Sequence, residues 1–201
     1  MRVGVLALQG DVSEHRAALA DLGVASTPVR SVTELDGVDA IVLPGGESTA
    51  IAHLLVTSGL LGPLESRLRA GMPAFGTCAG LVLLASSIAD GRPDQPALGL
   101  LDVTVLRNGY GRQISSFESS SELAGGVRVP TVFIRAPRIT EVGDGVEVLA
   151  TIDVGDGPHP VLVRQGSVLG ASFHPELTAD RTVHALFVDL ASSSSSASVQ
   201  N

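Results

Sequence analysis

The sequence contains one cysteine, no tryptophan, one tyrosine and five phenylalanines among its 201 residues. A single cysteine excludes an internal disulfide bond, so nothing in the composition points to an oxidising compartment. Because aromatic residues are few, valine, leucine, alanine and isoleucine must fill the core. No apolar run approaches the ~20 residues of a membrane-spanning helix, and the apolar start of the chain breaks at Gln9, too soon for a signal peptide. We therefore expect a cytoplasmic protein that does not enter a membrane.

Positive charge is also scarce, with 13 basic residues against 21 acidic ones and a formal net charge of −8. The basic residues form no stripe, which argues against a nucleic-acid surface. The length suits one α/β domain with a sizeable core. We expect this domain to cover residues 1–191. Residues 192–201 form a serine-rich tail with nothing to bury, which should be disordered.

Short apolar runs alternate with helical patterns in the first half of the chain. Strands are expected at residues 3–8, 24–29, 40–43 and 73–77, with a helix that begins near Asp11 as N-cap and further helices at 48–56, 60–70 and 79–88. This alternation predicts a three-layer α/β/α architecture around a mostly parallel sheet. Strands without intervening helices follow at 101–107, 127–134, 146–152, 160–163 and 168–173, and a helix at 178–191 closes the chain. They indicate an antiparallel extension, in which residues 143–145 and 155–157 are predicted hairpin turns.

The single cysteine, Cys78, lies in the sequence Gly76-Thr77-Cys78-Ala79-Gly80, between an apolar strand and an apolar helix. A lone cysteine is usually an inert core residue, and composition alone would favour that interpretation. Glycines two residues before and after it allow a sharp strand-to-helix turn that presents the side chain, as at a nucleophile. The start of the following helix would favour the thiolate. The flanking residues therefore indicate a nucleophile.

A second candidate segment, His174-Pro175-Glu176, follows another predicted strand. In an extended chain the imidazole and the carboxylate would project to the same side, and Pro175 would stiffen the link between them. A cysteine, a histidine and a carboxylate are the parts of an activated-nucleophile triad, although a solvated histidine beside a surface glutamate is the usual meaning of this tripeptide.

A third segment, residues 43–49, contains consecutive glycines between a strand and a helix. Gly45 and Gly46 leave backbone N–H groups unshielded, as an oxyanion hole requires, although Pro-Gly-Gly alone signals only a turn. All three segments follow the carboxyl ends of predicted strands, where open α/β sheets place their sites.

The other histidines, His15, His53, His159 and His184, have no partner at metal-ligand spacing. His15 and His184 fall on amphipathic helices, where surface roles are expected. The sequence contains no metal, nucleotide or flavin fingerprint, so we expect neither a metal site nor a cofactor.

Residues 76–80 and 174–176 together resemble the class I, or triad, glutamine amidotransferases. Within that class, the chain resembles the family of glutaminase subunits of pyridoxal 5′-phosphate synthases in five segments, namely residues 4–10, 43–49, 107–113, 132–137 and 172–178. The resemblance extends from the first strand to the last helix. It implies a flavodoxin-like core with the antiparallel extension described above.

The resemblance also implies the chemistry. Cys78, His174 and Glu176 would form the catalytic triad that hydrolyses L-glutamine, and the N–H groups of Gly46 and Ala79 would form the oxyanion hole. The glutamine pocket is expected to consist of Gly46, Glu47, Ser48, Arg107, Ile134 and Arg135. Arg107 or Arg135 suits the substrate carboxylate because a guanidinium can hold it through two hydrogen bonds.

The same resemblance implies a partner, since the chain contains no synthase domain of its own. Ammonia would pass to a separate (β/α)8-barrel subunit that makes pyridoxal 5′-phosphate, and docking would change the loop at Gly45 and Gly46. We expect Gln9, Gly10 and the first helix at that interface. The alternatives are the glutaminase subunit of imidazole glycerol phosphate synthase, which residues 8–10 and 107–113 disfavour, and a non-enzymatic regulator, which the intact triad disfavours.

Overall fold

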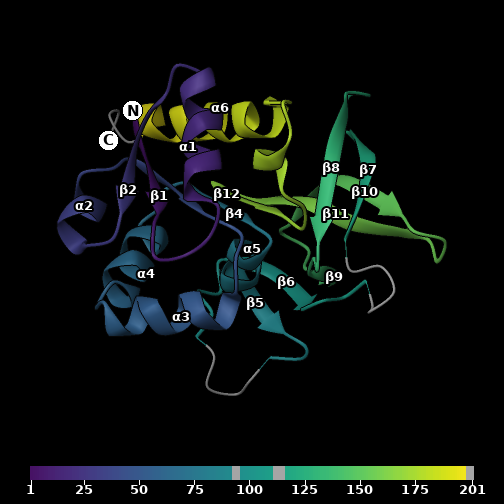
Figure 1. Cartoon of the computed structure of the whole chain (residues 1–201), viewed down its shortest axis with the longest axis horizontal. Helices are drawn as coiled ribbons and strands as arrows, with labels where there is room; N and C mark the ends of the chain where they lie inside the picture. The colour runs from purple at the N-terminus through teal and green to yellow at the C-terminus, as the bar shows by residue number, and fades with distance from the viewer. Residues whose placement is uncertain (92–95, 111–115, 198–201) are drawn as a thin grey trace.

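The computed structural model describes residues 1–91, 96–110 and 116–197. Its main sheet has nine strands, in the order β2-β1-β3-β4-β12-β11-β10-β7-β8 (Figure 1). The strands that pair in parallel are β1 (Arg2–Leu6), β2 (Ala25–Val29), β3 (Ala40–Leu43), β4 (Ala74–Thr77) and β12 (Val168–Ala171). The antiparallel extension consists of β11 (Pro158–Gln165), β10 (Glu147–Asp153), β7 (Ser116–Leu123) and β8 (Arg128–Ile134). The predicted mostly parallel sheet with an antiparallel extension is therefore correct.

Helices cover both faces of the parallel half. In Figure 1, α1 and α6 lie on one side of the sheet, and α3 and α4 lie on the other. The helices are α1 (Val12–Asp21), α2 (Val32–Asp36), α3 (Ser48–Thr57), α4 (Leu61–Arg69), α5 (Ala79–Leu84) and α6 (Thr182–Ala197), with a 3-10 turn, η1, at Pro175–Leu177. Alternate residues of the strands feed two apolar cores, since Val3 and Val5 of β1 pack with α1 and α6 whereas Leu6 packs with α3 and α4. A strand buried on both faces explains the continuous apolar runs in the sequence.

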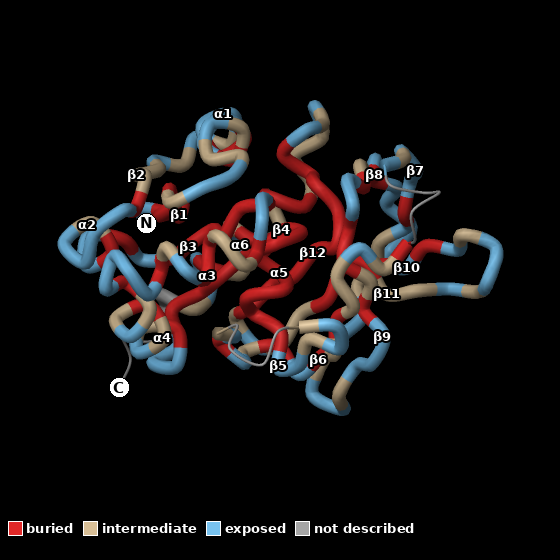
Figure 2. The backbone as a smooth tube through the Cα atoms, turned by 60° about the horizontal axis from the view of Figure 1, so that its bottom comes forward, coloured by how far each residue is buried: buried red, intermediate tan, exposed pale blue. Residues whose placement is uncertain are grey.

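Burial is deepest where the two halves of the sheet meet. Figure 2 shows that the buried backbone runs through β4, β12 and α5 in the centre of the molecule. All four residues of β4 and all six residues of α5 are buried. The residues that follow these elements therefore stand on a rigid base.

A second, three-stranded sheet contains β5 (Ala85–Ile88), β6 (Leu101–Leu106) and β9 (Arg138–Val142). The prediction of one helix over residues 79–88 is wrong, because the backbone becomes extended at Ala85 and β5 then pairs with β6. The predicted hairpin turn at 155–157 is confirmed, since it joins the antiparallel neighbours β10 and β11. Residues 143–145 connect β9 to β10 in different sheets, so the hairpin expected there is wrong.

The last helix also differs from expectation, because α6 continues to Ala197. Residues 192–197 are therefore helical rather than part of a disordered tail, and residues 198–201 lie outside the described residues. No glycine or proline stops the helix, and the hydroxyls of Ser192, Ser193 and Ser194 donate hydrogen bonds to the carbonyls of Val188, Asp189 and Leu190, four residues earlier. Within the described part of the chain, no helix is both long enough and apolar enough to span a membrane.

Candidate active site

The candidate residues meet at one edge of the main sheet. Adjacent strands β1, β3, β4 and β12 run parallel, so their carboxyl ends lie side by side. The loop after β1 carries Asp11, the loop after β3 carries Gly45 and Gly46, β4 leads directly to Cys78, and β12 leads to His174. The expected placement at the carboxyl ends of the strands is confirmed.

Cys78 occupies the sharp turn that its flanking glycines predict. It has a φ of 47°, a left-handed conformation that is unfavourable for a residue with a side chain. A Cβ on Gly80 would lie 1.9 Å from the carbonyl oxygen of Leu43, and one on Gly76 would lie 2.6 Å from Gly80. Both positions therefore require glycine for the turn to close. The Cys78 side chain is buried, and its Sγ lies 4.0 Å from the carbonyl oxygen of Ile134.

His174 and Glu176 form the predicted pair, with Nδ1 of the imidazole 2.8 Å from Oε1 of the carboxylate. Both side chains are buried. They meet because residues 175–177 form the 3-10 turn η1, rather than by projecting from an extended chain as the sequence suggested. Nδ1 donates to the carboxylate, so Nε2 is the nitrogen that can serve the nucleophile.

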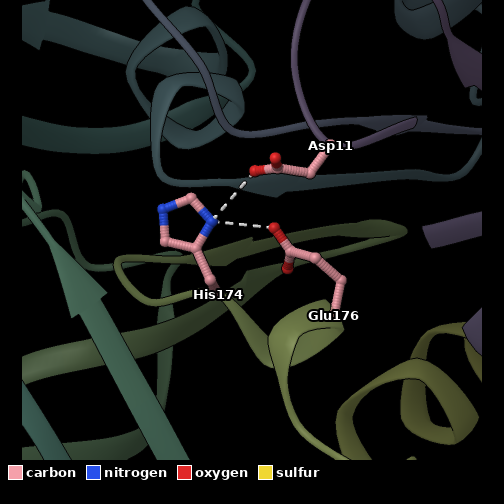
Figure 3. Close-up of side chains that lie close together, drawn as sticks. All are labelled: Asp11, His174 and Glu176. Atoms are coloured by element: carbon pink, nitrogen blue, oxygen red, sulfur yellow. Dashed lines mark hydrogen bonds and ion pairs between the residues drawn. The ribbon is translucent and has the colours of Figure 1, made fainter. Parts of the chain in front are cut away.

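A second carboxylate, that of Asp11, lies 3.5 Å from the same Nδ1, and Figure 3 shows both carboxylates facing this nitrogen. The sequence predicted Asp11 as the N-cap of α1, but its side chain makes no capping hydrogen bond. The residue before Asp11 must be glycine, because a Cβ on Gly10 would lie 1.8 Å from the carbonyl oxygen of Gly45. This close approach of the two loops places the Asp11 carboxylate beside His174. Burial disfavours a charged His174, but hydrogen bonds to Asp11, Cys78 and Glu176 outweigh it and raise the pKa of His174 to about 12. The site therefore holds an imidazolium at neutral pH.

The described residues contain one group that could hold a metal ion, made of Asp11, His174 and Glu176, whose ligand atoms all lie within 4.8 Å of one another. Nδ1 of His174 lies 3.5 Å from the Asp11 carboxylate and 2.8 Å from that of Glu176, and it donates its proton to Glu176. A proton on that nitrogen competes with a metal. The arrangement therefore fits a hydrogen-bonded imidazolium better than a metal centre.

The glycine loop after β3 lies against the histidine. A Cβ on Gly45 would lie 2.3 Å from Cε1 of His174, so only glycine fits there. The N–H of Glu47 donates to Oε1 of Gln9 at 3.0 Å, and the Glu47 side chain caps α3 by accepting from the N–H groups of Thr49 and Ala50. Gln9 thus holds the loop from the neighbouring strand end.

A cavity of about 130 Å³ opens beside Cys78. All of the residues expected to bind glutamine line it. The lining consists of Gly46, Glu47, Ser48, Cys78, Ala79, Val82, Arg107, Asn108, Ile134, Arg135 and Pro137.

The two arginines of this cavity differ in their surroundings. The Arg107 guanidinium lies 3.6 Å from the carboxylate of Asp90, donates to the Asp90 carbonyl at 2.9 Å and donates to the Thr49 hydroxyl at 3.2 Å. Arg135 is exposed and makes no ion pair with a carboxylate in the described part of the chain. The Arg135 charge is therefore less compensated than that of Arg107.

Comparison with known proteins agrees with the geometry of the site. Residues 5–193 match the SNO glutamine amidotransferase family. The chain belongs to this family. Two relatives called pyridoxal 5′-phosphate synthase subunit PdxT are similar over most of their length. The relative from Mycobacteroides abscessus is 56% identical over 189 residues, and the one from Mycobacterium leprae is 55% identical over 194 residues; each match covers 94% of this chain and 96% of the relative.

Solved structures of glutamine amidotransferases share the fold. A crystal structure described as a glutamine amidotransferase is 49% identical, with a TM-score of 0.88, and the match covers 94% of this chain and 98% of that chain. Another glutamine amidotransferase, from Thermotoga maritima, is 15% identical with a TM-score of 0.59, covering 96% of this chain and 85% of that chain, a likeness that concerns the fold alone. The predicted class I glutamine amidotransferase fold is therefore confirmed for this family member.

The expected surface location of His15 and His184 is wrong, because both side chains are fully buried in the amidotransferase core. Nδ1 of His15 lies 3.0 Å from Nε2 of His184, and Nε2 of His15 lies 3.1 Å from the hydroxyl oxygen of Thr77. The sequence carried a signal for this burial, since Ala18 and Leu19 follow His15 by three and four residues and therefore share its helix face.

Proposed function

We propose that the protein hydrolyses L-glutamine to L-glutamate and ammonia at Cys78 and supplies the ammonia to a separate pyridoxal 5′-phosphate synthase barrel subunit. The arrangement of side chains in the candidate site is the main support for this reaction. A strained cysteine, an imidazolium and a buried carboxylate open onto a cavity lined by two arginines and a glycine loop. Family membership and the names of the relatives support the same reaction and pathway.

The first half of the reaction forms a thioester. The Cys78 thiolate attacks the side-chain carboxamide carbon of glutamine, and the carbonyl oxygen becomes an oxyanion held by the N–H groups of Gly46 and Ala79. The C–N bond then breaks while the His174 imidazolium gives its Nε2 proton to the departing nitrogen. The products of this half are ammonia and a glutamyl thioester on Cys78.

Water completes the turnover. His174, now neutral, removes a proton from water as the oxygen attacks the thioester carbon. The C–S bond breaks and restores the thiolate and the imidazolium, and the new γ-carboxyl group loses its proton to solvent as glutamate leaves. Glu176 keeps Nδ1 protonated throughout, so that Nε2 alone carries the proton that moves.

Arg135 is the better candidate for the α-carboxylate of glutamine. Arg107 already faces the Asp90 carboxylate, whereas Arg135 is an exposed residue that lines the cavity without an ion-pair partner among the described residues. The remaining lining residues Glu47, Ser48 and Ile134 would shape the rest of the glutamine pocket. The Glu47 carboxylate caps the N-terminus of α3, so its role would be to fix the loop.

The partner would act on the loop after β3. Gln9 and Gly10 are exposed and hold Gly45, Gly46 and Glu47 in their present arrangement. A subunit that docks on this exposed loop can therefore move Gly46 and complete the oxyanion hole. We therefore expect the glutaminase activity to rise when the partner docks.

Glutamate release tests the proposal. We expect release that the pyridoxal 5′-phosphate synthase barrel stimulates, and none from Cys78→Ala with the same barrel. Activity that survives Cys78→Ala would exclude the mechanism. Stimulation by the imidazole glycerol phosphate synthase barrel, and not by the expected one, would exclude the pathway.

A further inference from the structure

Two histidines that the proposed chemistry does not use lie directly behind the triad. His15 of α1 and His184 of α6 are both fully buried. Nε2 of His15 lies 3.5 Å from Oε1 of Glu176, the oxygen that binds His174, and 3.1 Å from the hydroxyl oxygen of Thr77. Nδ1 of His15 faces Nε2 of His184 at 3.0 Å. Polar contacts therefore run from the last helix through His15 to the triad carboxylate.

The charge of the carboxylate selects the tautomer of His15. A lone pair on Nε2 would face the negative Oε1 of Glu176 and be repelled, so the proton belongs on Nε2. Nδ1 of His15 is then an acceptor, and His184 must supply the proton between them from its own Nε2. Both ring nitrogens of His15 then have a partner, whereas the buried Nδ1 of His184 has no hydrogen-bond partner within the described residues.

Both rings remain neutral at physiological pH. Burial, followed by repulsion from His184 and His174, lowers the pKa of His15 well below its usual value. Burial, followed by repulsion from Arg181, lowers the pKa of His184 to about 4. From the packed strand β4, Phe75 presents only its ring, 6.2 Å from that of His15 and 5.7 Å from that of His184. A neutral His15 can place its N–H beside Glu176 without competing with His174 for the carboxylate as a second cation.

We propose that His15 is a positioning residue of the glutaminase: its Nε2–H donates to Thr77, the residue before the nucleophile, and lies 3.5 Å from the Glu176 carboxylate, so that it holds both groups in place. One side chain of α1 thereby links the nucleophile turn to the group that orients His174. Loss of this donor would let Glu176 move away from His174 and weaken the imidazolium beside Cys78. The kinetic part of this role rests on the proposed function, whereas the effect on the cysteine does not.

Two substitutions of equal chemistry separate the positioning role from packing. In His15→Gln the side-chain amide reaches the place of Nε2 and can still donate to Thr77 beside Glu176. In His15→Asn the same amide sits one carbon closer to the backbone, near the place of Nδ1, and cannot. His53→Gln on α3, where the histidine is exposed, is the control for a histidine-to-glutamine change away from the site.

The measurements are the kcat and KM of glutamine hydrolysis with the synthase barrel, and the pH dependence of alkylation by iodoacetamide. Cys78 is the only cysteine, so alkylation reports on it alone. For His15→Asn we expect kcat to fall about tenfold with KM nearly unchanged, the scale of one buried hydrogen bond. The pH of half-maximal alkylation should rise by about one unit. His15→Gln should lie close to wild type in both measurements.

Each outcome decides a different point. Folded His15→Asn with wild-type kcat and alkylation profile would overturn the positioning role, as would folded His15→Gln with defects equal to those of His15→Asn. If no protein hydrolyses glutamine but His15→Asn alone shifts the alkylation profile, the positioning role stands and the proposed function fails.

Discussion

Replacement of His184 by glutamine should make the protein more resistant to acid. His184 is fully buried, and its pKa falls from the ordinary value of 6.5 to about 4 in the folded protein. Between pH 6.5 and pH 4, His184 is therefore protonated in the unfolded chain but remains neutral in the folded protein. Because the pKa of His184 is lower in the folded state, the stability that the neutral ring contributes is complete above pH 6.5. It decreases as the pH falls below 6.5 and is fully lost below pH 4.

The size of the effect follows from the two pKa values. The full separation corresponds to a loss of about 3.4 kcal/mol in the free energy of unfolding at low pH. At pH 5 the native ring is still neutral and the unfolded ring is protonated, so about 2 kcal/mol is already lost. His184→Gln removes this loss while keeping a donor near the place of Nε2 for His15. The variant also relieves the repulsion that lowers the pKa of His15, which acts in the same direction.

The assay is urea unfolding of wild type and His184→Gln at pH 7 and at pH 5. The relevant quantity is the drop in unfolding free energy between the two pH values for each protein, since any packing cost of the substitution is present at both. Titration of His174 cancels as well, because its pKa of about 12 in the folded protein is common to both chains. We expect the drop to be about 2 kcal/mol smaller in the variant. Equal drops in the two proteins would show that His184 is not the acid-sensitive group, and His53→Gln should behave like wild type.

Three further changes test the site. Asp11→Asn should lower the pKa of His174 by about one unit, as expected for a partly exposed charge at 3.5 Å in a water-like dielectric, and an NMR titration of the histidine ring measures it. An unchanged titration would remove Asp11 from the site. Gly80→Ala places a Cβ 1.9 Å from a backbone oxygen and should cost about 3 kcal/mol of stability, whereas Gly62→Ala, which meets no atom within 4 Å, should cost nothing in thermal unfolding. Arg135→Gln should raise KM for glutamine about tenfold with little change in kcat, and steady-state kinetics with an unaltered KM would exclude its role in binding the α-carboxylate.

The parts of this site that the sequence predicted are those fixed by local geometry. The turn at Cys78 follows from glycines two residues away on each side. The pairing of His174 with Glu176 is predicted from their separation by one residue, but a 3-10 turn rather than an extended chain brings them together. The parallel half of the sheet follows equally from apolar runs of strand length. Each of these features is decided within a few residues of chain, where propensity and spacing act directly.

The parts that the sequence missed depend on contacts across the fold. His15 and His184 are 169 residues apart in the sequence. Their mutual contact and burial require α1 and α6 to lie on the same face of the sheet. Strand β7, with serines and glutamates in place of an alternating apolar pattern, forms because β8 pairs with it along its length. From the sequence alone, Asp11 is equally well suited to cap α1. In the fold its carboxylate instead lies 3.5 Å from Nδ1 of His174.

Backbone strain in the described residues is concentrated at the cavity. Cys78, Asn108 and Arg135 are the residues other than glycine with positive φ in the described part of the chain, and all three line the pocket. Such conformations cost on the order of 1–3 kcal/mol each, so the surrounding structure must hold them. The N–H of Cys78 donates to the β12 carbonyl of Ala171 at 2.8 Å, and the N–H of His174 donates to the β8 carbonyl of Val132 at 2.8 Å. The antiparallel extension is therefore part of the framework of the candidate site: Ile134 at the end of β8 lines the pocket, and β8 also holds the backbone of His174.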